Sequence, residues 1–83
     1  MTKSNMTREK IVHTIGAIVA TLHEVGTDCA ESTVYMALGM DLEYYHDISG
    51  LMVASDLVII SGHRIKLTAK GVALAEDMLV IKS

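Results

Sequence analysis

Apolar positions follow helical spacing in four stretches of the chain and strand-like alternation in one. In residues 7–25 a stripe repeats at steps of four and three, as expected for a helix with a buried side. Its members are Ile11, Ile15, Ile18, Leu22 and Val25. A second ridge, Val12, Gly16 and Val19, makes this helix apolar on more than one side. Gly26-Thr27 predicts its end, because glycine tolerates a left-handed C-terminal position.

Two shorter helices are predicted next. Asp28 and Glu31 have the spacing of a capping box, which predicts a helix of about ten residues starting at Asp28 and ending at Gly39. Asp41 is expected to cap a third helix that runs to about residue 55. Its inward stripe consists of Tyr45, Ile48 and Met52, which are three and four residues apart.

The pattern changes to period two after residue 56. Two β-branched runs flank Ser61-Gly62-His63, which predicts a hairpin. In its second strand Arg64 and Lys66 share one face, and Ile65 and Leu67 share the other. Thr68 is expected to cap a last helix through about residue 81, with one stripe at Val72, Ala75 and Leu79 and another at Leu74, Met78 and Ile81.

The predicted fold is therefore mainly α with a small β-hairpin, an α+β class in the order α-α-α-β-β-α. Residues 1–6 are polar and are expected to form a flexible tail, and residues 7–83 are expected to form one domain. A helix pair joined by a short turn and followed by a hairpin is the winged helix-turn-helix order, in which the hairpin is the wing.

At residues 7–76 the chain resembles the winged-helix superfamily, most closely the small MarR- and PadR-like regulators of bacteria and archaea. The likeness is carried by Met52-Val53-Ala54-Ser55-Asp56-Leu57-Val58 and by Leu67-Thr68-Ala69-Lys70-Gly71 with Leu74. The resemblance implies a Thr68 that closes the wing and a Gly71 that lets the last helix approach the sheet. It also implies dimers that pair through their first and last helices and insert the third helix into DNA, although other members serve as protein docking modules.

The distribution of charge argues against DNA recognition by the third helix. Residues 27–57 contain six carboxylates and neither Lys nor Arg, a net charge of −6, whereas residues 1–26 and 58–83 carry +1 and +2. Because phosphate neutralisation supplies most non-specific DNA affinity, such a surface would repel a duplex. Wing-led contact remains the alternative, through Arg64, Lys66 and Lys70.

The outward face of the third helix is the candidate partner-binding surface. We call it the acidic face, and it consists of Glu43, His46, Asp47, Gly50 and Ala54. Three interpretations stay open: a solvated surface that keeps the protein soluble, a docking surface for a protein partner of basic character, and a surface that imitates nucleic acid.

Metal binding and catalysis are not indicated. None of the four His residues, the single Cys29 or the carboxylates has a recognised ligand spacing, so no metal or other cofactor is expected. Cys29 with His23 or His46 would need a cleft that so small a chain rarely provides, and no catalytic residue is assigned. Tyr44-Tyr45-His46 is either the lining of a small crevice or, more commonly for such a run, one core Tyr beside a half-exposed one.

Half of the residues are apolar, yet Phe, Trp and Pro are absent. A small chain cannot hide so much apolar surface, which predicts a homodimer. The expected interface consists of Val12, Gly16, Val19, Leu74, Met78 and Ile81. The sequence shows no membrane-length apolar run and no leader pattern, so a cytoplasmic location is expected.

The functional prediction is a non-enzymatic winged-helix regulatory or inhibitory module. It is expected to act by protein–protein contact through the acidic face. The alternative is a DNA-binding transcriptional regulator in which the wing leads the contact.

Overall fold

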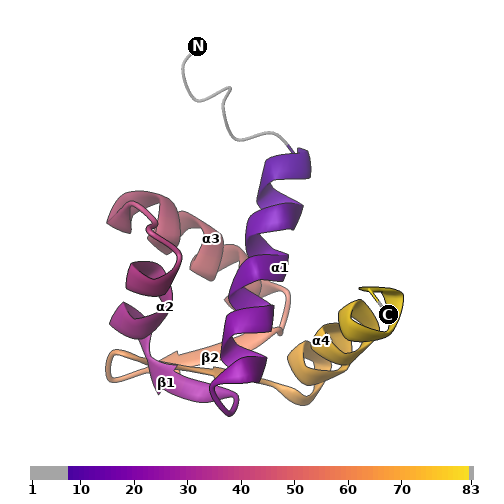
Figure 1. Ribbon diagram of the computed structural model, residues 1–83. Coiled ribbons are helices and arrows are strands. Elements are labelled where there is room, and N and C mark those ends of the chain that lie inside the picture. The colour runs from indigo at the N-terminus through magenta and orange to yellow at the C-terminus, as the bar shows by residue number, and fades with distance from the viewer. Residues whose placement is uncertain (1–7, 83) are drawn as a thin grey trace.

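Between residues 8 and 82, the part of the chain that the computed structural model describes, four helices are combined with three short strands (Figure 1). Side chains are described through Met78. The elements are α1 (Arg8–Glu24), β1 (Asp28–Ala30), α2 (Glu31–Ala37), α3 (Leu42–Ala54), β2 (Val58–Ser61), β3 (Arg64–Leu67) and α4 (Ala69–Lys82). The predicted α+β class is confirmed, whereas the predicted tail at residues 1–6 lies outside the described residues.

The sheet is antiparallel, with the order β1-β3-β2. The prediction that Asp28 begins a helix is wrong: Asp28 pairs with Lys66, Cys29 with Ile65 and Ala30 with Arg64. Helix α2 begins only at Glu31, and its N-cap residue Ala30 supplies no side-chain hydrogen bond. The backbone N–H of Glu31 instead donates to the His63 carbonyl at 2.9 Å. The hairpin turn therefore satisfies one of the backbone N–H groups that the start of a helix leaves without an intrahelical partner.

The predicted hairpin is confirmed. Strands β2 and β3 pair from Val58↔Leu67 to Ser61↔Arg64, and Gly62 and His63 have φ of 56° and 65°. Positive φ at both central residues is the requirement of a type I′ turn, whose twist matches that of the two strands. Ile65 and Leu67 are buried, while Arg64 and Lys66 are exposed on the opposite side of β3.

The core lies where α1, α3 and the inner side of the sheet meet. The predicted inward stripe of α3 is confirmed, because Tyr45, Ile48 and Met52 are all 0% exposed. Ile18 and Leu22 of α1 are likewise 0% exposed. The predicted stripe of α1 fails at its end, where Val25 follows the last helical residue and is 47% exposed.

Tyr44 and Tyr45 differ in burial, as expected for adjacent residues of a helix. Tyr45 is buried, whereas Tyr44 is half-buried and ties α3 to α1. The Tyr44 hydroxyl is 2.9 Å from the Thr14 Oγ1, and the Lys10 ammonium lies 5.4 Å from the centre of the Tyr44 ring. The choice of one core tyrosine and one half-exposed tyrosine is therefore confirmed.

The junction between the sheet and α4 is built around Thr68. Its hydroxyl donates to the Asp56 carbonyl at 2.6 Å and accepts from the Gly71 backbone N–H at 3.1 Å. The predicted cap of the last helix is thus confirmed. At Gly71 a Cβ would overlap the Leu57 carbonyl oxygen and lie 2.8 Å from the Leu67 Cδ2. The expectation that glycine lets this helix approach the sheet is therefore also confirmed.

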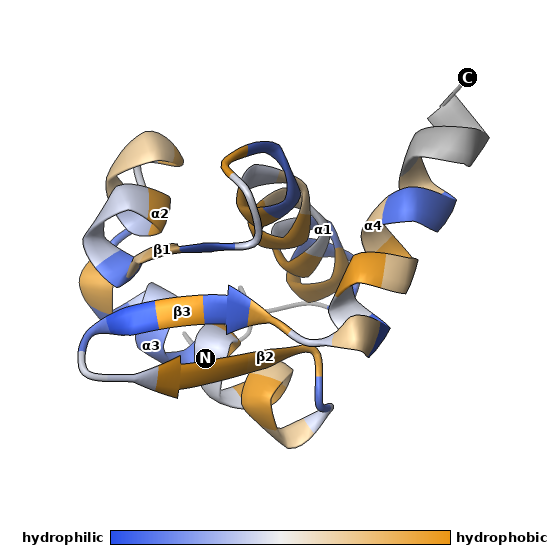
Figure 2. Ribbon diagram, turned by 90° about the horizontal axis from the view of Figure 1, so that it is seen from below, coloured by the Kyte–Doolittle hydropathy of each residue, from blue (hydrophilic) through white to orange (hydrophobic). Residues whose placement is uncertain are grey.

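Helix α1 lies between the α2–α3 pair on one side and α4 on the other (Figure 1). In Figure 2 apolar segments are visible on the part of α4 nearest α1. Helix α4 therefore packs against α1 and the end of the sheet. Helices α2 and α3, which carry the excess of carboxylates, and helix α4 therefore lie on opposite sides of α1.

Candidate functional site

The acidic face is exposed on the outward side of α3. Glu43, His46, Asp47, Gly50 and Ala54 are all exposed, because the buried residues of α3 direct the opposite side of the helix into the core. The carboxylate of Asp41 accepts from the Tyr44 N–H at 3.4 Å at the start of the helix, as predicted for its cap. The structure thus brings the five predicted partner-binding residues together on one open helix side.

Large apolar side chains border this acidic face, which the sequence reasoning missed. Leu42, Leu51 and Val53 of α3 are 50%, 44% and 45% exposed. The available signal was that all three fall outside the inward stripe of α3. Apolar side chains mixed with charged ones give this surface the composition of a protein contact site.

The hairpin β2–β3 carries less free positive charge than the sequence suggested. The Arg64 guanidinium forms an ion pair with the Asp28 carboxylate, with Nη2 and Nε both 3.2 Å from the same oxygen. This contact was missed because Asp28 was assigned to a helix rather than to the strand beside β3. Lys66 and Lys70 are exposed.

A cleft of about 420 Å³ opens beside the acidic face, where the start of α2, the start of α3 and the hairpin turn meet. It is lined by Ala30, Glu31, Ser32, Tyr35, Leu42, Tyr45, His46 and His63. We call it the aromatic cleft. The sequence offered a crevice lined by Tyr44-Tyr45-His46 as the less common of two alternatives, and of these three residues Tyr45 and His46 line the cleft. The walls at Glu31, Tyr35 and His63 were not predicted, because they depend on the unpredicted β1–β3 pairing.

Tyr45 and Glu31 form a polar pair in the aromatic cleft. The Tyr45 hydroxyl donates to the Glu31 Oε1 at 2.8 Å. Burial raises the pKa of Tyr45, and the hydrogen bond and negative charge of Glu31 raise it further. The phenol therefore remains protonated and holds one carboxylate oxygen in place.

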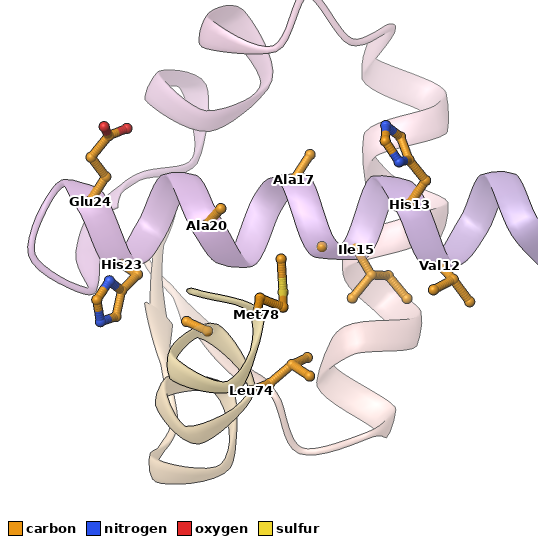
Figure 3. A pocket seen from close by; sticks show the side chains of 11 residues that line it. Val12, His13, Ile15, Ala17, Ala20, His23, Glu24, Leu74 and Met78 are labelled. Carbon is orange, nitrogen blue, oxygen red and sulfur yellow. The ribbon is translucent and has the colours of Figure 1, made fainter. Parts of the chain in front are cut away.

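A second groove, of about 710 Å³, runs between α1 and α4 (Figure 3). Leu74 and Met78 of α4 point toward α1, and the methyl group of Met78 would lie 3.3 Å from a Cβ at Gly16. Val12, at one end of the groove, is 62% exposed. Apart from the histidines and Glu24, the lining consists of apolar or small residues. We call it the α1–α4 groove.

Some of the residues predicted for a dimer interface line this groove. Val12, Gly16, Leu74 and Met78 line it. Val19 does not, because it is 0% exposed in the core and leaves no surface for a second chain. The assignment of Val19 to an interface is therefore wrong. The side chain of Ile81 lies outside the described residues.

The described residues offer little for chemistry at a metal or a thiol. Among them no group of three or more His, Cys, Asp or Glu side chains is arranged to hold a metal ion. Burial raises the pKa of the Cys29 thiol, and Asp28 adds to this while Arg64 opposes it. A raised pKa lowers the thiolate fraction and hence the reactivity of the sulfur. Within residues 8–82 no helix has the length and apolar character needed to span a membrane.

These features define a small, mainly helical α+β protein with a three-stranded antiparallel sheet and an exposed acidic helix face. Comparison with protein-family models, curated proteins and solved structures gives no match to this chain. The function of this chain is therefore inferred from its own residues and their geometry.

Proposed function

We propose that this protein is a non-enzymatic regulatory or inhibitory module that binds a basic protein partner through the acidic face. The observation that carries the proposal is the exposure of Glu43 and Asp47 on a helix pair without any compensating Lys or Arg in residues 27–57. Like charges near a partner surface suppress association, and opposite charges steer it. Such a surface attracts a basic partner and repels nucleic acid.

The apolar border of the acidic face adds support for a protein partner. Leu42, Leu51 and Val53 offer contact area beside the carboxylates, while Gly50 and Ala54 permit close approach of another backbone. An interface of this composition fits an amphipathic segment that carries Lys or Arg beside apolar residues. A surface kept only for solubility would not need exposed leucines.

A winged helix-turn-helix is the architecture that we propose for this module. The short connection between α2 and α3, the hairpin β2–β3 and the return of α4 against the sheet support this arrangement. The third strand, β1, extends the sheet beside β3 and is compatible with it. Fold alone does not assign a function, so the acidic face carries the functional argument.

The proposal is tested with a fluorescein-labelled amphipathic helical peptide built from Leu and Lys at helical spacing. A scrambled peptide of equal composition is the reference. Fluorescence anisotropy should show tighter binding to the helical peptide. The double variant Glu43→Gln/Asp47→Asn should weaken that binding by about tenfold, given 1–2 kcal/mol for two charged contacts. The matched control Glu9→Gln/Asp77→Asn removes one exposed carboxylate of α1 and one of α4, and should leave the affinity unchanged.

Two outcomes would contradict the proposal. If both double variants reduce the affinity equally, the peptide responds to net charge rather than to the acidic face. If the scrambled peptide binds as tightly as the helical one, the apolar border has no role in recognition.

A homodimer that pairs through the α1–α4 groove belongs to the same proposal. Exposed Val12 and the apolar groove supply surface for a second copy of the chain. Sedimentation equilibrium from 10 μM to 1 mM should show a dimer that Val12→Lys abolishes. Ile59→Lys is the control, because Ile59 is 57% exposed, close to the 62% of Val12, but lies on the sheet. A monomer at the highest concentration, or equal effects of both variants, refutes the dimer.

The alternative function, a DNA-binding regulator, is favoured by exposed Lys66 and Lys70 and by the position of Arg64 on the wing. Its test is an anisotropy titration with a mixed-sequence duplex at low salt. We expect negligible affinity. Micromolar binding with a steep salt dependence, reduced by Arg64→Ala and Lys66→Ala, would reverse the ranking of the two functions.

A further inference from the structure

The aromatic cleft brings together three segments that are distant in the sequence. Residues 30–35 contribute the end of β1 and the start of α2, residues 42–46 contribute the start of α3, and His63 contributes the hairpin turn. The Glu31 N–H to His63 carbonyl bond holds the first and third segments together. Two residues of the cleft are shared with the acidic face: His46 belongs to that face and Leu42 borders it. The cleft therefore opens onto that surface.

Aromatic rings form much of the wall. The centres of the Tyr35 and Tyr45 rings are 5.2 Å apart with a tilt of 55°, and those of Tyr45 and His46 are 5.8 Å apart with a tilt of 59°. Tyr45 is 0% exposed and forms the floor, whereas Tyr35 is half-buried and His46 is exposed. The accessible rings therefore stand at the sides of the cleft.

The Glu31 carboxylate supplies a negative charge to the aromatic cleft. One carboxylate oxygen is held by the Tyr45 hydroxyl at 2.8 Å. An ionised carboxylate has about four lone-pair sites, so this bond leaves acceptor capacity for a ligand. Among the described residues that line the cleft, none is Lys or Arg. A negative charge fixed between aromatic rings is suited to a cation and not to an anion.

We propose that the aromatic cleft receives the guanidinium group of an arginine side chain from the basic partner. A planar guanidinium can stack on a ring such as Tyr35 and bond the Glu31 carboxylate at its edge. A lysine ammonium gains less, because it is more strongly hydrated and cannot stack. This inference rests on the proposed function and specifies which side chain of the partner the module recognises.

The probe for this site is Nα-acetyl-arginine amide, added to the full chain while ¹H–¹⁵N correlation spectra are recorded. We expect saturable shifts at residues 30–35, 42–46 and 63, with a dissociation constant in the millimolar range typical of a single small group. The citrulline analogue has the same shape without the charge and should give no saturable shifts. The lysine analogue should bind at least threefold more weakly, reflecting the loss of stacking.

Glu31→Gln is the decisive variant. The glutamine amide oxygen can still accept from the Tyr45 hydroxyl, so the polar pair is retained while the charge is removed. This change should weaken arginine binding by about tenfold. Glu76→Gln removes the same charge from an exposed position of α4, outside both the cleft and the acidic face, and should change the affinity less than twofold. Tyr35→Leu, at a half-buried position, tests the ring independently and should also weaken binding.

Several results would overturn the inference. Equal losses in Glu31→Gln and Glu76→Gln would indicate diffuse attraction by net charge. Equal binding of the lysine analogue would exclude guanidinium recognition. If the helical peptide binds the acidic face while the arginine probe leaves the cleft residues unshifted, the cleft inference fails and the proposed function stands. If the peptide also shows no dependence on Glu43 and Asp47, both fail together.

Discussion

Replacing Gly71 by Ala should destabilise the fold, although the same change inside a helix ordinarily stabilises it. Gly71 lies in the first turn of α4, directly over the chain that leads into β2. An added Cβ would overlap the Leu57 carbonyl oxygen, which is backbone and cannot rotate away, and would lie 2.8 Å from the Leu67 Cδ2. Either α4 or the Leu57 peptide must shift.

The size of the effect follows from two opposing contributions. Alanine in place of glycine gains about 1 kcal/mol from helix propensity and a less flexible unfolded chain. Overpacking of this kind costs about 1–3 kcal/mol. The Leu57 carbonyl also accepts from the Thr68 N–H at 3.0 Å, and losing that bond costs about a further 1–2 kcal/mol. The net expectation is a loss of about 1–4 kcal/mol, and its midpoint of about 2.5 kcal/mol corresponds to roughly 10–20 °C in Tm for a domain of this size.

Urea unfolding followed by circular dichroism at 222 nm measures this loss, since the chain has no Trp to report by fluorescence. Gly50→Ala is the matched control: Gly50 lies inside α3, nothing stands within 4 Å of its added Cβ, and neither glycine has positive φ. It should stabilise the protein by about 0.5–1 kcal/mol. If Gly71→Ala is as stable as the unchanged protein, the close approach of α4 to the sheet is not as tight as described.

Three further stability predictions follow from single contacts. Thr68→Val removes a hydroxyl that bonds both the Asp56 carbonyl and the start of α4, and urea unfolding should show a loss of about 1–2 kcal/mol that Thr68→Ser mostly avoids. Tyr45 has a raised pKa, so its protonated form stabilises the folded state below the unfolded pKa of about 10, and this contribution falls as the pH rises above it. Tyr45→Phe should therefore lose less stability than the unchanged protein between pH 9 and 11.5, and parallel loss in both would exclude a role for this phenol. Thr27 is β-branched and has a φ of 73°, a conformation that asparagine adopts at lower cost. Thr27→Asn should therefore stabilise the protein by about 1 kcal/mol, measured as a higher midpoint of urea unfolding. A lower midpoint would refute backbone strain at Thr27.

The helices and the hairpin could be predicted because each is specified by residues close in the sequence. Tyr45, Ile48 and Met52 repeat at helical spacing and are buried together. Thr68 was correctly assigned as a cap, since a hydroxyl at a helix start has a local physical role. The close approach at Gly71 followed from the resemblance, because its contacts with Leu57 and Leu67 are tertiary.

Strand β1 could not be predicted, and its absence from the prediction had consequences for the site. Asp28–Ala30 is too short to show an alternating pattern, and Asp28 with Glu31 imitates a helix start. The extended conformation of residues 28–30 is stabilised instead by their pairing with β3, which is distant in the sequence. The Asp28–Arg64 ion pair was missed for the same reason.

The acidic face was predicted from the inward stripe of α3, because a helix with a known buried side has a known exposed side. The aromatic cleft was not predicted as a whole. Its walls come from β1, α2, α3 and the turn, and their convergence depends on tertiary contacts that no local pattern contains. Val19 was misassigned because apolar spacing alone does not say which of two apolar ridges contacts the core.

The position of β3 between β1 and β2 sets the order in which the chain can fold during synthesis. Ala30 pairs with Arg64, so β1 and the backbone bond at the start of α2 must wait until the hairpin has left the ribosome. Bringing these segments together closes a long loop, at an entropic cost of roughly 3 kcal/mol. The α2–α3 pair therefore acquires its final support late. A nascent chain interrupted before β3 would expose the acidic helices without the strand that fixes where α2 begins.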